Sequence, residues 1–172
     1  QAREWFDLTG VGKAPARLDF DKLAHVNAHW IRLADDDRLA KMTLDVHLAR
    51  GHVLGPDDEA RLLRAMPFIK DRAKTVLELA DQTGFALKVR PLSIYEKAQP
   101  MLTGESGERI GRLRDRLKLF ASWDVFALEA ELKVFAEEEA VGFGKIGPAV
   151  RAALTGDGVS PDIAKTLAAL GR

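Results

Sequence analysis

The chain has 172 residues, of which 47% are hydrophobic, and its 26 Lys and Arg residues balance its 26 Asp and Glu residues. This length and apolar content suffice for one domain or two small ones with a real core, and the zero net charge gives no general attraction to nucleic acid or to an anionic membrane. The lack of cysteine excludes a disulfide framework and thiolate chemistry, and no apolar run approaches the roughly 20 residues of a membrane span.

These features predict a cytoplasmic, monomeric protein without a membrane or DNA partner. The opening "QAREWFDL" has no initiator Met and has the pattern of a helix already under way. We therefore expect the chain to be a part of a longer protein.

Apolar residues recur at three- and four-residue intervals, and the alternation typical of a half-buried strand is almost missing, which predicts an all-α fold. A helix is expected from Asp19, and the acids Asp35 to Asp37 are expected to begin the next one. A further helix is expected from Pro56, with Pro67 as a point of division. The apolar stripe of the first helix consists of Leu23, Val26, Trp30 and Leu33.

The segment "QTGFALKVRPLS" is the best candidate for a domain boundary, because Gly and Pro interrupt the helical pattern there. We therefore expect two tandem helical bundles, residues 1–90 and 91–172, with about eight to ten helices. The two last helices are expected to begin at Pro148 and Pro161, and to end at Gly156 and Gly171.

The stretch "VGFGKIGPAVRAALTG" contains three glycines around Lys145, as phosphate-binding loops do. However, Ile146 stands where such a loop needs a hydroxyl, and the dinucleotide-binding spacing fails as well. Spacing alone predicts a flexible turn between helices.

Candidate metal or catalytic residues are few. His25 and His29 have the helical spacing of zinc ligands, but Val26 replaces the glutamate of the H-E-x-x-H motif. Asp35 to Asp37 suggest a magnesium cluster, although acids in the first turn of a helix need no further explanation. We expect no metal, no cofactor and no autonomous active site in this chain.

Basic residues form two groups, and each could contact a phosphate backbone. The alternative is a solvated face paired with acids, which we favour for the second group. The first group is Arg61, Arg64, Lys70, Arg72 and Lys74, and the second is Arg109, Arg112, Arg114, Arg116 and Lys118.

The segment "WFDLTGVGKAPARLDFDKLAHVNAHWIR" resembles bacterial glutamyl-tRNA synthetases just after their KMSKS-type loop. Leu18 and Val26 are small departures from the family pattern. The closing "PAVRAALTGDGVSPDIAKTLAALG" is similar to the end of the same family. The likeness spans nearly the whole chain and is weak through residues 35–60.

This resemblance implies the carboxy-terminal anticodon-binding region alone, because HIGH-like and KMSKS-like motifs are missing. The region is described as two successive all-α domains around the anticodon loop, in a glutamate–tRNA ligase whose catalytic domain uses ATP and Mg²⁺. The implied partner is tRNA(Glu), with tRNA(Gln) as an open addition. By resemblance, Arg72 faces the first anticodon base, while Lys22 and His25 lie near the inner elbow of the tRNA. The positions implied to approach the second and third bases are Arg151, Ser160, Pro161 and Ile163.

Two alternatives stay open at this point. A helical protein-interaction module would need only apolar stripes and balanced charge. A small magnesium enzyme would be built on Asp35 to Asp37.

Overall fold

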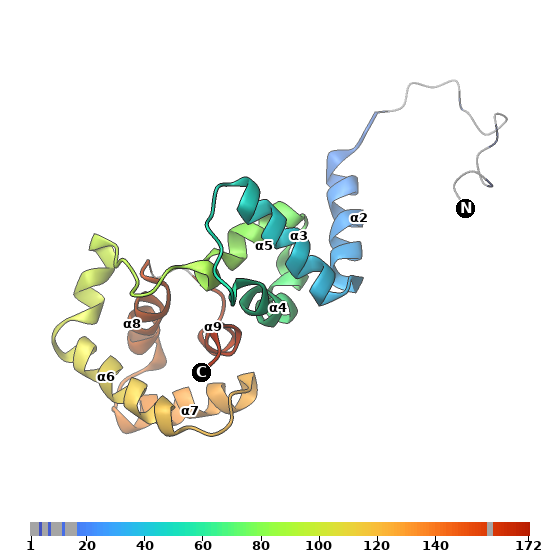
Figure 1. Ribbon diagram of the computed structural model, residues 1–172. Helices are drawn as coiled ribbons and strands as arrows, with labels where there is room; N and C mark the ends of the chain where they lie inside the picture. Colours follow the sequence, from blue (N-terminus) through green and yellow to red (C-terminus); the bar gives the residue numbers. More distant parts are fainter. Residues whose placement is uncertain (1–3, 5–6, 8–11, 13–16, 158–159) are drawn as a thin grey trace.

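The computed structural model describes residues 4, 7, 12, 17–157 and 160–172, and every regular element in this part of the chain is helical (Figure 1). The all-α prediction is confirmed. These residues form eight α-helices and three 3₁₀ helices. The helix expected at the very start of the chain lies outside the described residues. None of the described helices is long and apolar enough to cross a membrane.

We call the elements from α2 to η3 the first unit. They are α2 (Phe20–Leu33), α3 (Asp36–Ala49), α4 (Asp58–Ile69), η2 (Lys70–Arg72), α5 (Val76–Thr83) and η3 (Gly84–Leu87). The helix expected from Pro56 is α4, and it ends after Ile69 instead of dividing at Pro67.

We call the elements from η4 to α9 the second unit. They are η4 (Glu96–Leu102), α6 (Gly104–Leu119), α7 (Val125–Glu138), α8 (Phe143–Thr155) and α9 (Ile163–Leu170). A segment without regular structure, residues 88–95, joins the two units.

Five helices have an N-cap residue whose side chain accepts a hydrogen bond from a backbone N–H group of the first turn. These N–H groups have no partner within the helix, so the cap satisfies them. Asp19 accepts from Lys22 N and Asp35 accepts from Arg38 N, so both predicted starts are confirmed. The remaining caps are Thr75, Asp124 and Asp162.

The stretch around Lys145 is a helix and not a flexible turn. α8 begins at Phe143, with Gly142 at the N-cap, so Pro148 lies inside the helix instead of starting it. Pro148 has no N–H to donate to the carbonyl four residues earlier, so α8 lacks one backbone hydrogen bond in its second turn. The predicted end at Gly156 is confirmed, because this residue has a φ of 79° and its N–H donates to the carbonyl of Ala152.

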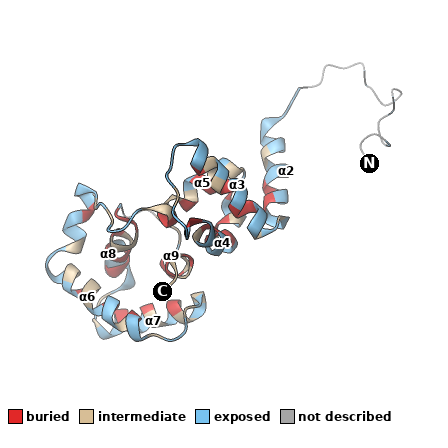
Figure 2. Cartoon of the chain, viewed as in Figure 1, coloured by how far each residue is buried: buried red, intermediate tan, exposed pale blue. Residues whose placement is uncertain are grey.

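Buried apolar residues form two clusters, the first mostly from the first unit and the second from the second unit. Figure 2 shows buried residues along helices of both units. Leu62, Met66 and Leu79 lie at the centre of the first cluster, and Leu128, Leu132 and Ile146 at the centre of the second. The division predicted near residue 90 falls in the segment that joins the two units. That this segment is a domain boundary remains a prediction.

Helix α9 contributes to both clusters. Its Ile163, Ala164 and Leu167 side chains belong to the second cluster, while Ala169 belongs to the first. α9 packs against α4 of the first unit as well as against α7 and α8. The last helix therefore joins the two units by direct packing.

The apolar stripe predicted for α2 does not face the core of this chain. Leu23, Val26, Trp30 and Leu33 are exposed, Trp30 at 63%, whereas Ala28 and Ile31 are the buried residues of the helix. The helix rests on η2 by the narrow side that carries these two residues. Periodicity identified the helix, but the stripe alone did not indicate which side of the helix is buried.

Candidate nucleic-acid interface

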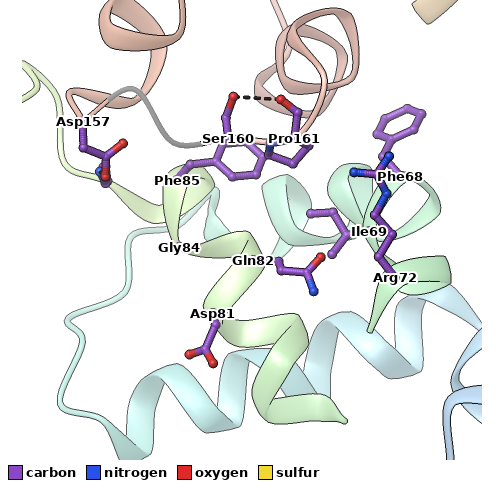
Figure 3. A pocket seen from close by; sticks show the side chains of 11 residues that line it. Phe68, Ile69, Arg72, Asp81, Gln82, Gly84, Phe85, Asp157, Ser160 and Pro161 are labelled. Carbon is purple, nitrogen blue, oxygen red and sulfur yellow. Dashed lines mark hydrogen bonds and ion pairs between the residues drawn. The ribbon is translucent and has the colours of Figure 1, made fainter. Parts of the chain in front are cut away.

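A pocket of about 420 Å³ lies where the first unit meets the segment before α9 (Figure 3). Arg72 comes from η2, immediately after α4, while Ser160 and Pro161 come from the loop that leads into α9. Three predicted site residues, Arg72 and the adjacent Ser160 and Pro161, thus line one pocket although the pair is far from Arg72 in sequence. Its volume is within the range of small-ligand sites, roughly 300–1,000 Å³.

Arg72 is exposed, and no described residue pairs with its guanidinium. Its neighbour Ala73 is buried in the first cluster and its neighbour Lys70 pairs with Asp36 at 2.6 Å, so the backbone on both sides is held in place. The anchored η2 turn therefore presents a cation without an acid partner at the pocket.

Ser160 and Pro161 form the opposite wall. The Ser160 hydroxyl donates to the carbonyl oxygen of Pro161 at 3.0 Å, and the following Asp162 caps α9. On the same side, Lys88 Nζ lies 2.6 Å from Asp157 Oδ2 and donates to the carbonyl of Thr155 at 2.7 Å. These contacts link the segment after α5 to the segment before α9.

Arg151 lies in the middle of α8, since the helix begins earlier than expected, and it is not among the residues that line the pocket. Its side chain is half-buried, and its Nε atom is buried with no acceptor among the described residues. A buried donor without a partner costs about 1–3 kcal/mol.

The other three predicted residues lie elsewhere. Ile163 is 1% exposed and packs in the second cluster, so its side chain supports the start of α9 and does not reach the surface. Lys22 and His25 are exposed on α2, away from the pocket.

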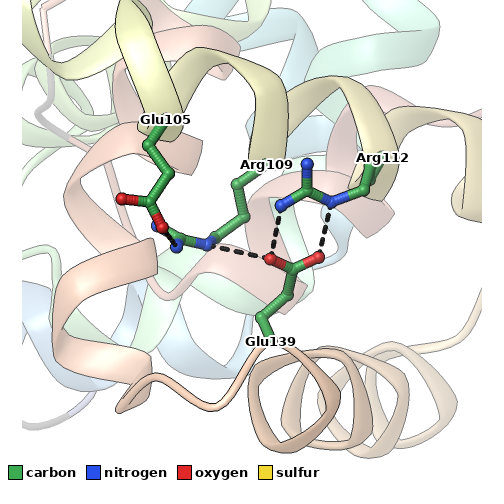
Figure 4. Close-up of polar contacts among 4 residues, drawn as sticks. All are labelled: Glu105, Arg109, Arg112 and Glu139. Atoms are coloured by element: carbon green, nitrogen blue, oxygen red, sulfur yellow. Dashed lines mark hydrogen bonds and ion pairs between the residues drawn. The ribbon is translucent and has the colours of Figure 1, made fainter.

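The second basic group is neutralised by acids on neighbouring helices. Glu139 accepts a forked pair of hydrogen bonds from Arg112, at 2.6 Å each, and a third from Arg109 (Figure 4). The Arg112 pair, followed by Arg109, lowers the pKa of Glu139 to about 2. Arg116 pairs with Glu131 and Glu138, and Asp115 pairs with Arg114 and Lys118. The favoured alternative for this group, a surface paired with acids, is confirmed.

Asp35, Asp36 and Asp37 each have a different structural partner. Asp35 caps α3, Asp36 pairs with Lys70, and Asp37 pairs with Lys41. Within the described part of the chain, no group of three metal-ligating side chains gathers at any point. The three acids stabilise helix α3 and its contact with Lys70, which removes the basis of the magnesium-enzyme alternative.

Sequence reasoning did not identify four further residues that line the pocket, Phe68, Gln82, Phe85 and Lys88. Phe68 stands one helical turn before Arg72, so that spacing could have found it. Gln82 lies in the last turn of α5, and Phe85 and Lys88 follow that helix. Nothing in these residue types indicates that α5 brings them near Arg72.

The model of the anticodon binding domain family matches residues 30–172. This match covers most of the chain, and the chain belongs to this family.

Proteins named glutamate–tRNA ligase are similar over the full length of the chain. The protein of Caulobacter vibrioides is 52% identical over 172 residues, and that of Phenylobacterium zucineum is 48% identical over 172 residues. In each case the match covers 100% of this chain and 37% of the relative, so the chain spans little more than a third of these proteins. The resemblance drawn from the two ends of the sequence is confirmed.

The fold matches that of a glutamate tRNA ligase from Elizabethkingia meningosepticum, whose crystal structure was solved with its amino acid. The TM-score is 0.72 at 22% identity, over 96% of this chain and 32% of that chain. This likeness supports the all-α fold.

Proposed function

We propose that this chain binds the anticodon loop of tRNA(Glu) and gives tRNA specificity to a glutamate–tRNA ligase. Membership of the anticodon binding domain family and the relatives named glutamate–tRNA ligase support this function. By this proposal, the chain carries no catalytic step itself. ATP and Mg²⁺ would be used by the catalytic region of the longer protein.

The observation that carries the proposal is the convergence of Arg72, Ser160 and Pro161 on one pocket. Sequence-specific recognition of RNA commonly targets unstacked loop bases, which are held by stacking and by hydrogen bonds to their edges. An arginine can stack on a base or donate forked hydrogen bonds to it. The pocket offers such a cation beside aromatic and apolar walls.

The distribution of charge supports the same surface. The basic group on α6 is paired with acids, so it offers little free positive charge. The side chains of Arg72 and Lys74 have no acid partner among the described residues; Arg72 lines the pocket, and Lys74 stands two residues further along the chain. Phosphates of a bound loop would find their counter-charge there.

The test is binding of the chain to the anticodon stem-loop of tRNA(Glu), compared with the same stem carrying a scrambled loop. We expect preference for the native loop, affinity that falls as salt rises, and weaker binding by Arg151→Ala without loss of helicity. Arg114→Ala, an arginine paired with Asp115 on α6, is the matched control and should bind as the unmodified chain does. Equal affinity for both loops would overturn the proposal.

A further inference from the structure

Gln82 is a polar residue of the pocket that the resemblance does not assign to any role. It lies in the last turn of α5, is half-buried, and lines the pocket together with Ile69 and Arg72. No described residue forms a hydrogen bond with its side-chain amide. An amide at the wall of a pocket with both donor and acceptor free is available to a ligand.

The backbone on both sides of Gln82 is held in place by its neighbours in sequence. Asp81 pairs with Arg50 at 2.7 Å, and the buried Thr83 lies 3.3 Å from His47 Nε2. Arg50 and His47 stand at the end of α3, so both neighbours of Gln82 are anchored to that helix. In Figure 3 the Gln82 side chain extends toward Ile69 and Arg72, whereas the Asp81 carboxylate points away from them. A residue on a helix that is anchored in this way is positioned well enough to recognise a ligand specifically.

The surroundings of Gln82 match the requirements of a nucleobase. Phe68, Ile69, Phe85 and Pro161 supply apolar walls, and Arg72 supplies a cation. The amide of glutamine places a donor beside an acceptor, and base edges carry the complementary pair. Small-ligand sites typically have apolar walls and a few polar groups that point to the same place. Such a site can accept one planar ring and orient it through hydrogen bonds to the edge of the ring.

We propose that Gln82 reads the hydrogen-bonding edge of one unstacked anticodon base that enters this pocket beside Arg72. The inference rests on the proposed function, because it takes an anticodon loop as the ligand. Gln82 supplies the contact to the base edge, and Arg72 supplies charge and a stacking surface.

The experiment is a double-mutant cycle between the protein and the RNA. Gln82→Met keeps the length and removes the donor and the acceptor, and abasic nucleotides replace the three anticodon bases one at a time in the stem-loop. We expect Gln82→Met to weaken binding of the intact loop about five- to tenfold, the effect of roughly one lost hydrogen bond to a ligand. One of the three abasic loops should bind the variant and the unmodified chain equally well. In that loop the base that Gln82 contacts has been removed, so the substitution has no contact left to break.

Gln99→Met is the matched control, since Gln99 is an exposed glutamine in η4, far from the pocket lining. It should bind the intact loop as the unmodified chain does. Gln82→Asn is the second variant, and it keeps the amide but shortens the side chain. It should bind the intact loop more weakly than the unmodified chain does. The two proteins should bind equally well to the loop that lacks the same anticodon base. Circular dichroism of each variant checks that the helices are intact.

The outcomes separate the inference from the function on which it rests. If the unmodified chain does not prefer the native loop over the scrambled one, the proposed function fails. If that preference is present but the Gln82 variants lose no affinity, or lose it equally at every abasic position, the role of Gln82 is overturned and the proposed function stands.

Discussion

Arg64 donates from its Nε atom to the carbonyl oxygen of Ala169 at 3.2 Å, across a sequence separation of 105 residues. Its Nη2 atom donates to the carbonyl of Leu170 at 3.4 Å. Both carbonyls belong to the last turn of α9, where backbone acceptors have no partner within the helix and positive charge is favourable. A side chain of the first unit thus caps the last helix of the second.

Arg64→Met should lower the free energy of unfolding by about 1 kcal/mol, because two helix-end carbonyls lose their donor. Urea unfolding followed by circular dichroism measures the change. Arg38→Met is the control, since Arg38 is exposed on α3 and its side chain has no acid partner in the described part of the chain. Equal losses in the two variants would contradict the capping role.

Gly156→Ala should destabilise the chain by at least about 2 kcal/mol, through a left-handed backbone and a close contact. The φ of Gly156 is 79°, and an added Cβ would lie 2.5 Å from the carbonyl oxygen of Ser93. The Gly156 carbonyl also accepts from Tyr95 N at 2.9 Å, so any shift would disturb the segment between the units.

Thermal unfolding compares this variant with Gly84→Ala. At Gly84 an added Cβ would meet no atom within 4 Å, and φ is −52°. Gly84→Ala should therefore unfold within a degree or so of the unmodified chain. Similar melting temperatures for the two variants would contradict the steric argument.

The sequence predicted the helices better than their faces. Caps such as Asp19 and Asp35 are local, because the hydrogen bond spans three residues, and both were predicted correctly. The buried face of α2 depends on what the helix packs against, so the apolar stripe that includes Trp30 predicted the helix but did not show which face lies in the core. The start of α8 was misplaced because Pro148 was taken as a first-turn residue.

The candidate site was predicted only through resemblance. The sequence placed Arg72 in a basic group, but its position opposite Ser160 and Pro161 depends on how α9 returns to the first unit. That return is a long-range packing event without a local sequence signal. Ile163 illustrates the same point, since its place in the family pattern reflects a buried contact of the helix that follows Pro161.

Glu139 should make the stability of the chain sensitive to acid. The hydrogen bonds from Arg112, and then those from Arg109, lower the pKa of Glu139 from 4.5 to about 2. The folded state therefore binds this proton more weakly than the unfolded chain does. The stabilisation is complete above pH 4.5 and is lost as the pH falls toward 2.

Glu139→Gln removes this contribution, so its free energy of unfolding should lie below that of the unmodified chain at neutral pH and approach it in acid. Glu137→Gln is the control, because Glu137 is exposed in the last turn of α7, two residues before Glu139. Urea unfolding at a series of acidic pH values gives the comparison. If the free energy of unfolding of Glu139→Gln falls with pH in parallel with that of the unmodified chain, Glu139 is not the origin of the acid sensitivity.

His47 should make stability fall as the pH drops below about 6.5. The Thr83 hydroxyl donates to the Leu79 carbonyl at 2.8 Å, so it accepts from His47 Nε2 and leaves the buried Nδ1 without a described partner. Burial, followed by the nearby His52 and Arg50, lowers the pKa of His47. The unfolded chain then takes up the proton first, which favours unfolding as the pH falls.

The measurement is the free energy of unfolding as a function of pH around 6.5. His47→Gln should abolish the decline, while His52→Gln should retain most of it, because His52 is exposed. A decline of the same size in both variants would place the titrating group elsewhere.

Under the proposed function, Arg72→Gln, made in the longer protein to which this chain belongs, should increase charging of the tRNA(Gln) whose anticodon begins with C. By resemblance, family members with arginine at this position tend to reject that tRNA, and those with a smaller polar residue accept it. The expected change is roughly 1–3 kcal/mol in discrimination, the cost of a buried mispaired contact. Ratios of charging rates for tRNA(Glu) and tRNA(Gln) measure it, with Arg114→Gln as the control. An unchanged ratio would make Arg72 a solvated surface residue.

The place of α9 in both clusters has a consequence for synthesis on the ribosome. Chains emerge from the amino terminus, and domains generally fold as units when all of their residues are available. The residues of α2 to η3 emerge early, but Ala169 completes their core and Arg64 finds its acceptors only when the last helix follows. Part of the first cluster therefore stays exposed to solvent until about 80 further residues have been synthesised. The first unit reaches its final packing together with the second.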